Sequence, residues 1–240
     1  MLEREQLESA VATVLDEWGR IDLLLNNGRY IGPGHMDRLV DTPLDLLDKH
    51  LAANVMAPLA LIDKRPGVTI GGVLRNWGLV FVGNFGGAFT VALAMAIVTT
   101  FGFSTEPNAV GKAIGVIGEN RTLGYAQYGA AGMLTLFVRG MLCNWMVSTG
   151  VVAAMMSTSV SGKVIAMWMP IMVFFYMTFE HSIVNMFLFP SGLLLGAHFT
   201  IVDYLIWNEI PTVLGNLVGG LSFTGLTLYS THLKTAAKRG

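Results

Sequence analysis

Long stretches with almost no charge dominate the chain after residue 76. The charged side chains inside these stretches are Arg139 and Glu180. A helix needs about 20 apolar residues to cross the hydrocarbon core of a bilayer. The pattern therefore predicts an all-α membrane region with four membrane-spanning helices, at about 77–103, 130–157, 164–195 and 210–232.

Charge divides the chain into two parts. Of the first 76 residues 19 are charged, which is typical of a soluble protein, whereas only 12 of the following 164 are charged. The net charge of −1 excludes a basic surface for nucleic acid. A single cysteine, Cys143, excludes an intramolecular disulfide and a cysteine-rich metal site. No metal or cofactor is expected, and the short, interrupted apolar stretch at the start does not resemble a signal peptide.

The distribution of basic residues predicts the orientation in the membrane. Four crossings place both flanks of the membrane region on one side. The loops expected on the other side, at 104–125 and 197–209, carry four acidic and two basic residues. Because basic residues accumulate on the cytoplasmic side, we expect a multi-pass protein of the inner membrane with both termini in the cytoplasm. The basic residues on that side are Lys64, Arg65, Arg75, Lys163, Lys234, Lys238 and Arg239.

The first and fourth predicted spans share a short repeat. Residues 83–88 read Gly-Asn-Phe-Gly-Gly-Ala, and residues 215–220 read Gly-Asn-Leu-Val-Gly-Gly. Gly-xxx-Gly pairs allow close approach of helix backbones, so helix packing alone explains the glycines. The shared asparagine favours a duplicated transporter fold instead. The expected packing residues are Gly83, Gly87, Gly215 and Gly219.

The third predicted span contains polar residues at its centre. Glu180, His181 and Asn185 are costly in hydrocarbon and should face the protein interior or a pore. Pro190 and Gly192 follow and are expected to interrupt the helix, as in transporters whose broken helices line the substrate path. The alternative is a buried histidine hydrogen-bonded to Asn144 or Ser182, with the proline only kinking the helix.

Four segments together resemble the formate/nitrite transporter family. The resemblance covers roughly residues 65–234. It is carried by Phe179–Phe187 (Phe-Glu-His-Ser-Ile-Val-Asn-Met-Phe), Arg139–Val147 (Arg-Gly-Met-Leu-Cys-Asn-Trp-Met-Val), the Gly83-Asn84 segment and Asn208–Asn216 (Asn-Glu-Ile-Pro-Thr-Val-Leu-Gly-Asn).

That resemblance implies an aquaporin-like fold of six helices in two inverted three-helix units. It also implies homo-pentamers in which each protomer has its own pore for formate, nitrite or similar small monovalent anions. By position, His181 is similar to the central pore histidine and Asn144 to the asparagine that hydrogen-bonds it. Val147 and Phe174 correspond to a pore constriction. The residues expected along the anion path are His181, Asn144, Val147, Phe174, Phe179, Glu180 and Asn185, although aromatic residues in such helices are usually packing.

The physical chemistry of a small anion agrees with this expectation. An apolar constriction opposes a charged solute, and a polar site with helix N-termini lowers the cost of leaving water. An imidazole can also pass a proton to a weak acid such as formate, which gives the hypothesis of proton-coupled transport.

The chain departs from the family pattern in two places. Family members often carry a lysine near the start of the fourth helix of the fold, whereas residues 126–129 here are Ala-Gln-Tyr-Gly. The first two helices of the family are also expected to be missing, because residues 1–64 contain no apolar run of 18 residues.

Residues 7–62 resemble the middle of a short-chain dehydrogenase/reductase. An apolar strand ends in Asn26-Asn27-Gly28, and the helix expected at about 43–60 contains Asn54, which corresponds to a catalytic asparagine. The Gly-rich phosphate loop and a tyrosine followed four residues later by lysine are lacking. We therefore expect residues 1–64 to be an incomplete α/β Rossmann-like fragment, joined to the membrane domain of residues 65–240. The sequence leaves open a natural fusion, a gene rearrangement or an artefact of gene prediction.

Three functions are compatible with the sequence, and we rank them by how well its motifs support each one. The first is an anion channel or transporter, complete or impaired by truncation. The second is a non-conducting partial channel subunit, and the third is a membrane-tethered reductase fragment, for which the required motifs are missing. The sequence favours a transporter rather than an enzyme.

Overall fold

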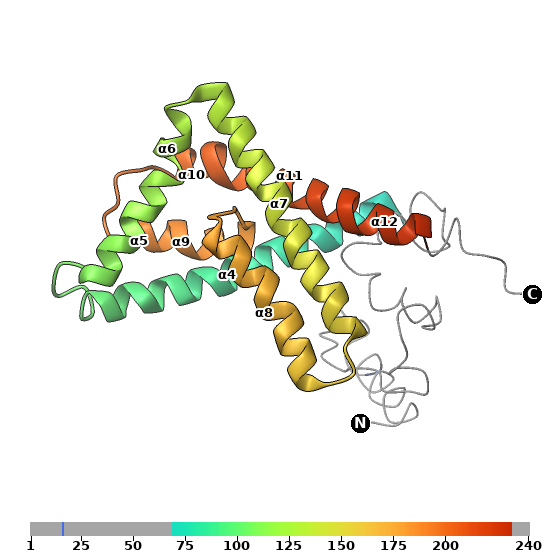
Figure 1. Ribbon diagram of the computed structural model, residues 1–240. Coiled ribbons are helices and arrows are strands. Elements are labelled where there is room, and N and C mark those ends of the chain that lie inside the picture. The colour runs from blue at the N-terminus through green and yellow to red at the C-terminus, as the bar shows by residue number, and fades with distance from the viewer. Residues whose placement is uncertain (1–15, 17–68, 232–240) are drawn as a thin grey trace, which may run out of the picture.

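All regular structure in the described part of the chain is helical. The computed structural model describes residue 16 and residues 69–231 (Figure 1). The dehydrogenase-like fragment and Asn54 lie outside the described residues. Two helices are long and apolar enough to cross a membrane by themselves, α4 (Ile70–Thr99) and α7 (Gly129–Met156). They occupy the first and second predicted spans.

The third span is broken, but at a different place from the one expected. Helix α8 (Val160–Tyr176) ends before Met177, and helix α9 (Ser182–Leu194) begins five residues later. Thr178 has a positive φ of 53°, which ends the helical path of α8. Pro190, where the break was expected, lies inside α9. A proline removes one backbone donor and bends a helix, but it does not necessarily end it.

The first of the two segments expected as loops is partly helical. Residues 104–125 contain α5 (Ala109–Asn120) and most of the short α6 (Leu123–Ala126). The side chain of Asn108 accepts hydrogen bonds from the amides of Val110 and Gly111 and so caps α5. Charge density, on which the loop expectation rested, reports contact with water and says little about helix continuity.

The last helix begins at Ile201, nine residues before the expected start. Thr200 and Asp203 form a capping box there, and hydrogen bonds from the Thr200 side chain and backbone lower the pKa of the Asp203 carboxyl. The helix alternates α and π turns, which are α10 (Ile201–Tyr204), η1 (Leu205–Glu209), α11 (Ile210–Gly219), η2 (Gly220–Gly225) and α12 (Leu226–Tyr229).

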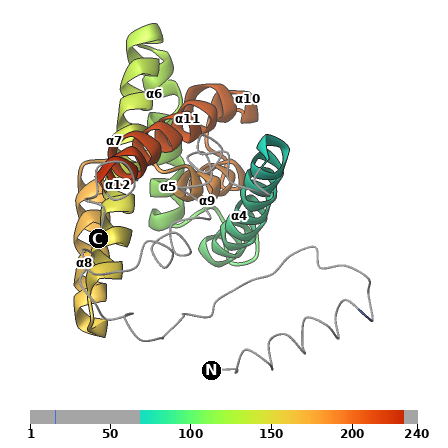
Figure 2. The same cartoon turned by 90° about the vertical axis from the view of Figure 1, so that its right-hand side faces the viewer.

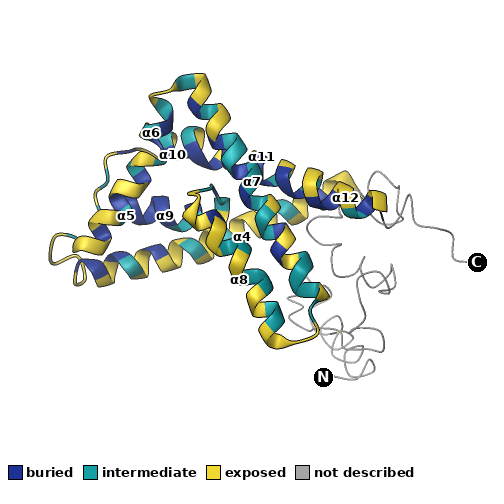
Figure 3. Ribbon diagram, viewed as in Figure 1, coloured by how far each residue is buried: buried dark blue, intermediate teal, exposed yellow. Residues whose placement is uncertain are grey.

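The helices form two packed groups. Helix α7 packs against α8 on one side and α11 on the other, while α9 lies against α4 and α5 (Figures 1 and 2). An aromatic cluster closes the end of α9, where Phe189 stacks on Tyr204 at 4.6 Å between ring centroids and meets Phe199 edge-on at 5.5 Å. Much of α4 remains exposed (Figure 3).

The two repeated glycine pairs have different surroundings. A Cβ at Gly215 or Gly219 would overlap backbone atoms of α7, so these glycines permit the close contact between α11 and α7. A Cβ at Gly83 or Gly87 would have no described heavy atom within 4 Å apart from its own helix and chain neighbours. Within the part of the chain that the structure describes, only the second pair therefore lies in a helix contact.

Gly219→Ala is expected to destabilise the protein by about 1–3 kcal/mol, because the new methyl group must push α11 away from the carbonyl of Met141. Gly87→Ala is the matched control. It should be neutral or stabilising by up to about 1 kcal/mol, since alanine is the better helix former. Unfolding by SDS in detergent micelles, followed by maleimide labelling of the buried Cys143, measures both. Equal effects of the two substitutions would contradict the packing difference.

Candidate functional site

One side chain from α11, that of Asn216, forms hydrogen bonds that stabilise the break between α8 and α9. The amide nitrogen of Asn216 donates to the carbonyls of Gly140, at 2.8 Å, and Glu180, at 2.9 Å. Its amide oxygen accepts from the backbone N–H of Ser182 at 3.1 Å. Ser182 is the first residue of α9, so a side chain from another helix caps this N-terminus. Asn216 thereby ties α7, α11 and the break together.

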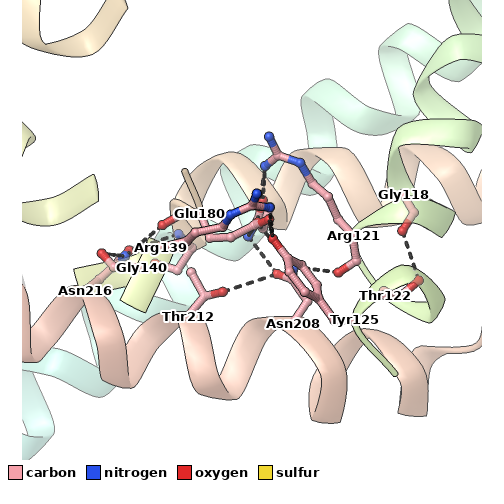
Figure 4. A network of polar contacts seen from close by, with 12 residues as sticks. Gly118, Arg121, Thr122, Tyr125, Arg139, Gly140, Glu180, Asn208, Thr212 and Asn216 are labelled. Carbon is pink, nitrogen blue, oxygen red and sulfur yellow. Dashed lines mark hydrogen bonds and ion pairs between the residues drawn. The ribbon is translucent and has the colours of Figure 1, made fainter. Parts of the chain in front are cut away.

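Glu180 is the centre of a buried polar network. Its side chain is completely buried, and its carboxylate accepts four hydrogen bonds (Figure 4). A buried carboxylate is costly unless donors replace its water, and one donor here is a guanidinium. The donors are Tyr125 Oη at 2.8 Å, Asn185 Nδ2 at 3.0 Å, Arg121 Nη1 at 3.2 Å and Asn208 Nδ2 at 3.3 Å.

The donors to Glu180 are also bonded to one another. Asn185 Nδ2 donates to Asn208 Oδ1 at 2.7 Å, and Asn208 Nδ2 donates to the carbonyl of Arg121 at 2.9 Å. These residues come from α9, the last helix and the turn after α5. The network thus joins three segments that are far apart in the sequence, and it fixes Glu180 beside the break.

A second arginine reaches the network through a tyrosine. The Tyr125 hydroxyl donates to Glu180 and accepts from Arg139 Nη1 at 2.8 Å. The Arg139 guanidinium carbon lies 5.7 Å from the centroid of the Tyr125 ring. Among the described residues Arg139 pairs with no carboxylate, whereas Arg121 pairs with Glu180.

His181 stands at the end of the break, directly before α9. Its ring stacks on Phe174, with 5.8 Å between centroids, and its Nδ1 is buried without a hydrogen-bond partner among the described residues. The amide of Asn144 donates to the carbonyl of Asn216 at 2.6 Å and not to the imidazole. The hydrogen bond between Asn144 and His181 that the family resemblance implied is therefore not formed in this structure, in which the Asn144 amide is directed to the backbone of the last helix.

The other expected path residues have different surroundings. Phe174 is 3% exposed and closes one side of the imidazole. Phe179 is half-buried, and its backbone amide donates to the carbonyl of Phe174. Val147 is half-buried on α7, two turns before the end of that helix. Asn185 and Glu180 belong to the polar network, so the structure brings these two polar residues together with Phe174 and Phe179 at the break, whereas no contact joins Val147 to it among the described residues.

A cavity of about 850 Å³ leads to this region from the α6 side. The break contributes Thr178 and Glu180 to its wall, and Arg121, Tyr125 and Arg139 contribute the polar groups opposite. Two guanidinium groups and two residues of the break therefore line the same cavity.

Sequence reasoning missed several members of the network. Arg121 and Tyr125 were assigned to a loop, and Asn208 and Asn216 were quoted only as parts of motifs. Arg121 supplies a positive charge near the position where the family lysine is absent. The signal that could have pointed to a partner such as Arg121 was Glu180, an acid at the centre of a predicted span that contains no Lys or Arg. Among the described residues, no group of three or more side chains could hold a metal ion.

Comparison with known proteins identifies the family. The sequence model described as "Formate/nitrite transporter" matches residues 51–230. A "Probable formate transporter" from Methanothermobacter thermautotrophicus is 36% identical over 74% of this chain and 65% of its own length. The formate channel BtFdhC of Bacillus thuringiensis is 30% identical over 77% of this chain and 66% of its own length. The solved structure "Pentameric formate channel with formate bound" is similar with a TM-score of 0.57 and 25% identity, covering 68% of each chain.

The comparisons also bear on the N-terminal part. The family match includes residues 51–64, which the sequence interpretation had assigned to the dehydrogenase-like fragment, and none of these matches supports that fragment. The chain spans 65% of the length of the first of these relatives. The matched relatives are named as transporters or channels and not as enzymes. The helical fold and the family match together show that this chain is an integral membrane protein and belongs to the formate/nitrite transporter family.

Proposed function

We propose that the protein carries small monovalent anions, such as formate or nitrite, across the membrane. The main support for this proposal is the geometry of the break, where a histidine ring lies at the N-terminus of a half-helix beside a buried polar network. The named activities of the relatives support the same substrate class. The proposed path passes His181, Asn144, Val147, Phe174, Phe179, Glu180 and Asn185.

The physical argument rests on the cost of moving an anion out of water. Phe174 keeps one side of the imidazole apolar, which opposes a hydrated charge. The N-terminus of α9 and the imidazole next to it favour negative charge at the same level. Passage of a weak acid is easiest where it can take up a proton, and His181 is the group placed to exchange one.

Assembly and orientation complete the proposal. The chain is proposed to form a homo-oligomer, a pentamer by analogy with the solved formate channel. Both termini are proposed to face the cytoplasm at the inner membrane, following the basic residues. The membrane domain is proposed to begin at residue 65.

A second candidate is a partial subunit that does not conduct alone and assembles with complete channel chains. The exposed face of α4 around Gly83 and Gly87, which has no neighbour among the described residues, favours it. Co-purification with a complete channel chain, without flux from this chain alone, distinguishes this candidate from the first.

His181→Ala is expected to lower formate and nitrite flux into liposomes by at least about ten-fold, equivalent to about 1.4 kcal/mol on the barrier. The variant removes the polar ring and leaves Phe174 facing the path. His198→Ala is the control, because that exposed residue lies after α9 and its side chain forms no hydrogen bond among the described residues. Unchanged flux with unchanged pH dependence in His181→Ala would rule out proton exchange at this residue.

A further inference from the structure

The cavity beside α6 carries an excess of positive charge. Its charged wall residues are Arg121, Arg139 and Glu180, which is two guanidinium groups against one carboxylate. Glu180 is completely buried and fully occupied by protein donors, whereas the Arg121 side chain is 18% exposed. Because Arg121 pairs with Glu180, Arg139 is the charged wall residue without a partner of opposite charge among the described residues.

Arg139 is the group with unused hydrogen-bonding capacity. A guanidinium has five N–H donors in a planar fork, and only Nη1 is bonded to a described side chain, the Tyr125 hydroxyl. That hydroxyl is held in turn by Glu180 at 2.8 Å, so the arginine is held in place through the tyrosine (Figure 4). A pre-positioned guanidinium loses little further freedom when it binds a planar two-oxygen anion.

The position of Arg139 in the membrane makes an uncompensated charge informative. It lies ten residues after the start of α7, well inside a helix long enough to span the bilayer. A cation at such depth normally pairs with an acid or marks an ion path. Thr178 and Glu180 of the break also line the cavity, and His181 follows Glu180 in the chain.

We propose that Arg139, positioned by Tyr125 and assisted by Arg121, forms an anion-binding site in this cavity, where a small planar oxyanion is held before it reaches His181. The assignment rests on the proposed anion transport and names the residue that selects the substrate class at its α6-side approach. Carboxylates and nitrite offer two oxygens to the fork, whereas chloride offers a single point of contact.

Protection from chemical modification tests the site without transport. Phenylglyoxal modifies accessible arginines, and mass spectrometry of peptides gives the rate at Arg139 in the unmodified 240-residue protein. The protein is held in detergent with lipid removed, at constant ionic strength. Formate and nitrite are expected to slow modification saturably, by at least about three-fold, and chloride to protect less. If added phospholipid slows the modification of Arg139 and formate and nitrite do not, the site binds a lipid headgroup, and the proposal is overturned.

Two other results would also overturn it. Equal protection by formate and chloride would mean ionic screening only, and an Arg139 that never reacts would mean that its guanidinium does not face the cavity. Because this assay needs no flux, its failure is distinct from failure of the proposed transport function.

Flux through reconstituted variants gives the second readout. Arg139→Gln is expected to raise the formate concentration for half-maximal flux by about 3- to 10-fold, and Arg139→Lys to raise it less. Lys112→Gln is the matched control, since it removes one positive charge from exposed α5 outside the cavity. An equal shift in Arg139→Gln and Lys112→Gln would reduce the effect to general surface charge and contradict a specific site.

Discussion

Glu180→Ala is expected to lower the free energy of unfolding by about 3–5 kcal/mol, a large fraction of the stability of a typical domain. The substitution leaves the Arg121 guanidinium without its carboxylate and removes the acceptor of three further donors. It also opens a void at a position with no exposure to solvent. The segments joined by the network, the turn after α5, α9 and the last helix, should then separate more easily.

The measurement is SDS-induced unfolding in micelles, followed by maleimide labelling of Cys143, which is fully buried on α7. Glu106→Ala is the matched control, an exposed acid between α4 and α5, and it should change stability by less than about 0.5 kcal/mol. If the loss arises mainly from the unpaired charge, the double variant Glu180→Gln with Arg121→Gln should be more stable than Glu180→Gln alone. A Glu180→Ala protein as stable as the control would show that the network contributes nothing.

Asn216→Ala is expected to destabilise the protein by about 2–4 kcal/mol, because it removes three hydrogen bonds to backbone groups at and beside the break. The carbonyls of Gly140 and Glu180 lose a donor, and the amide of Ser182 loses its acceptor at the start of α9. Since water reaches the membrane interior poorly, those groups cannot be compensated as they would be on a soluble surface. The break should lose its fixed geometry, so formate flux is expected to fall together with stability.

The internal repeat supplies the control for this prediction. Asn84 occupies the same motif position in α4, is half-buried, and has no side-chain hydrogen bond among the described residues. Asn84→Ala should therefore change the SDS midpoint of the chain much less than Asn216→Ala. Equal losses would contradict the assignment of Asn216 as the particular clamp of the break, and would show that Asn84 has a buried partner of its own.

The sequence by itself determined the membrane helices and the family. Uncharged stretches of sufficient length can satisfy their backbone only as helices in a bilayer, so α4 and α7 lie within a few residues of their expected positions, except for the early start of α4. The Phe179–Phe187 segment also indicated residues that face the protein interior or a pore, because Glu180, His181 and Asn185 are too costly to face lipid. These conclusions depend on local composition, which does not change with tertiary contacts.

Only the tertiary structure decided where the third helix breaks and what holds the break. The sequence pointed to Pro190, yet the chain leaves the helix at Met177–His181, where Asn216 from another helix replaces the lost backbone hydrogen bonds. The pairing of Arg121 with Glu180 joins residues 59 positions apart, and no local pattern encodes it. The two Gly-xxx-Gly pairs look alike in sequence but differ in their neighbours. Such features depend on which distant groups meet, and a hydrogen bond or a close contact exists only once both partners are in place.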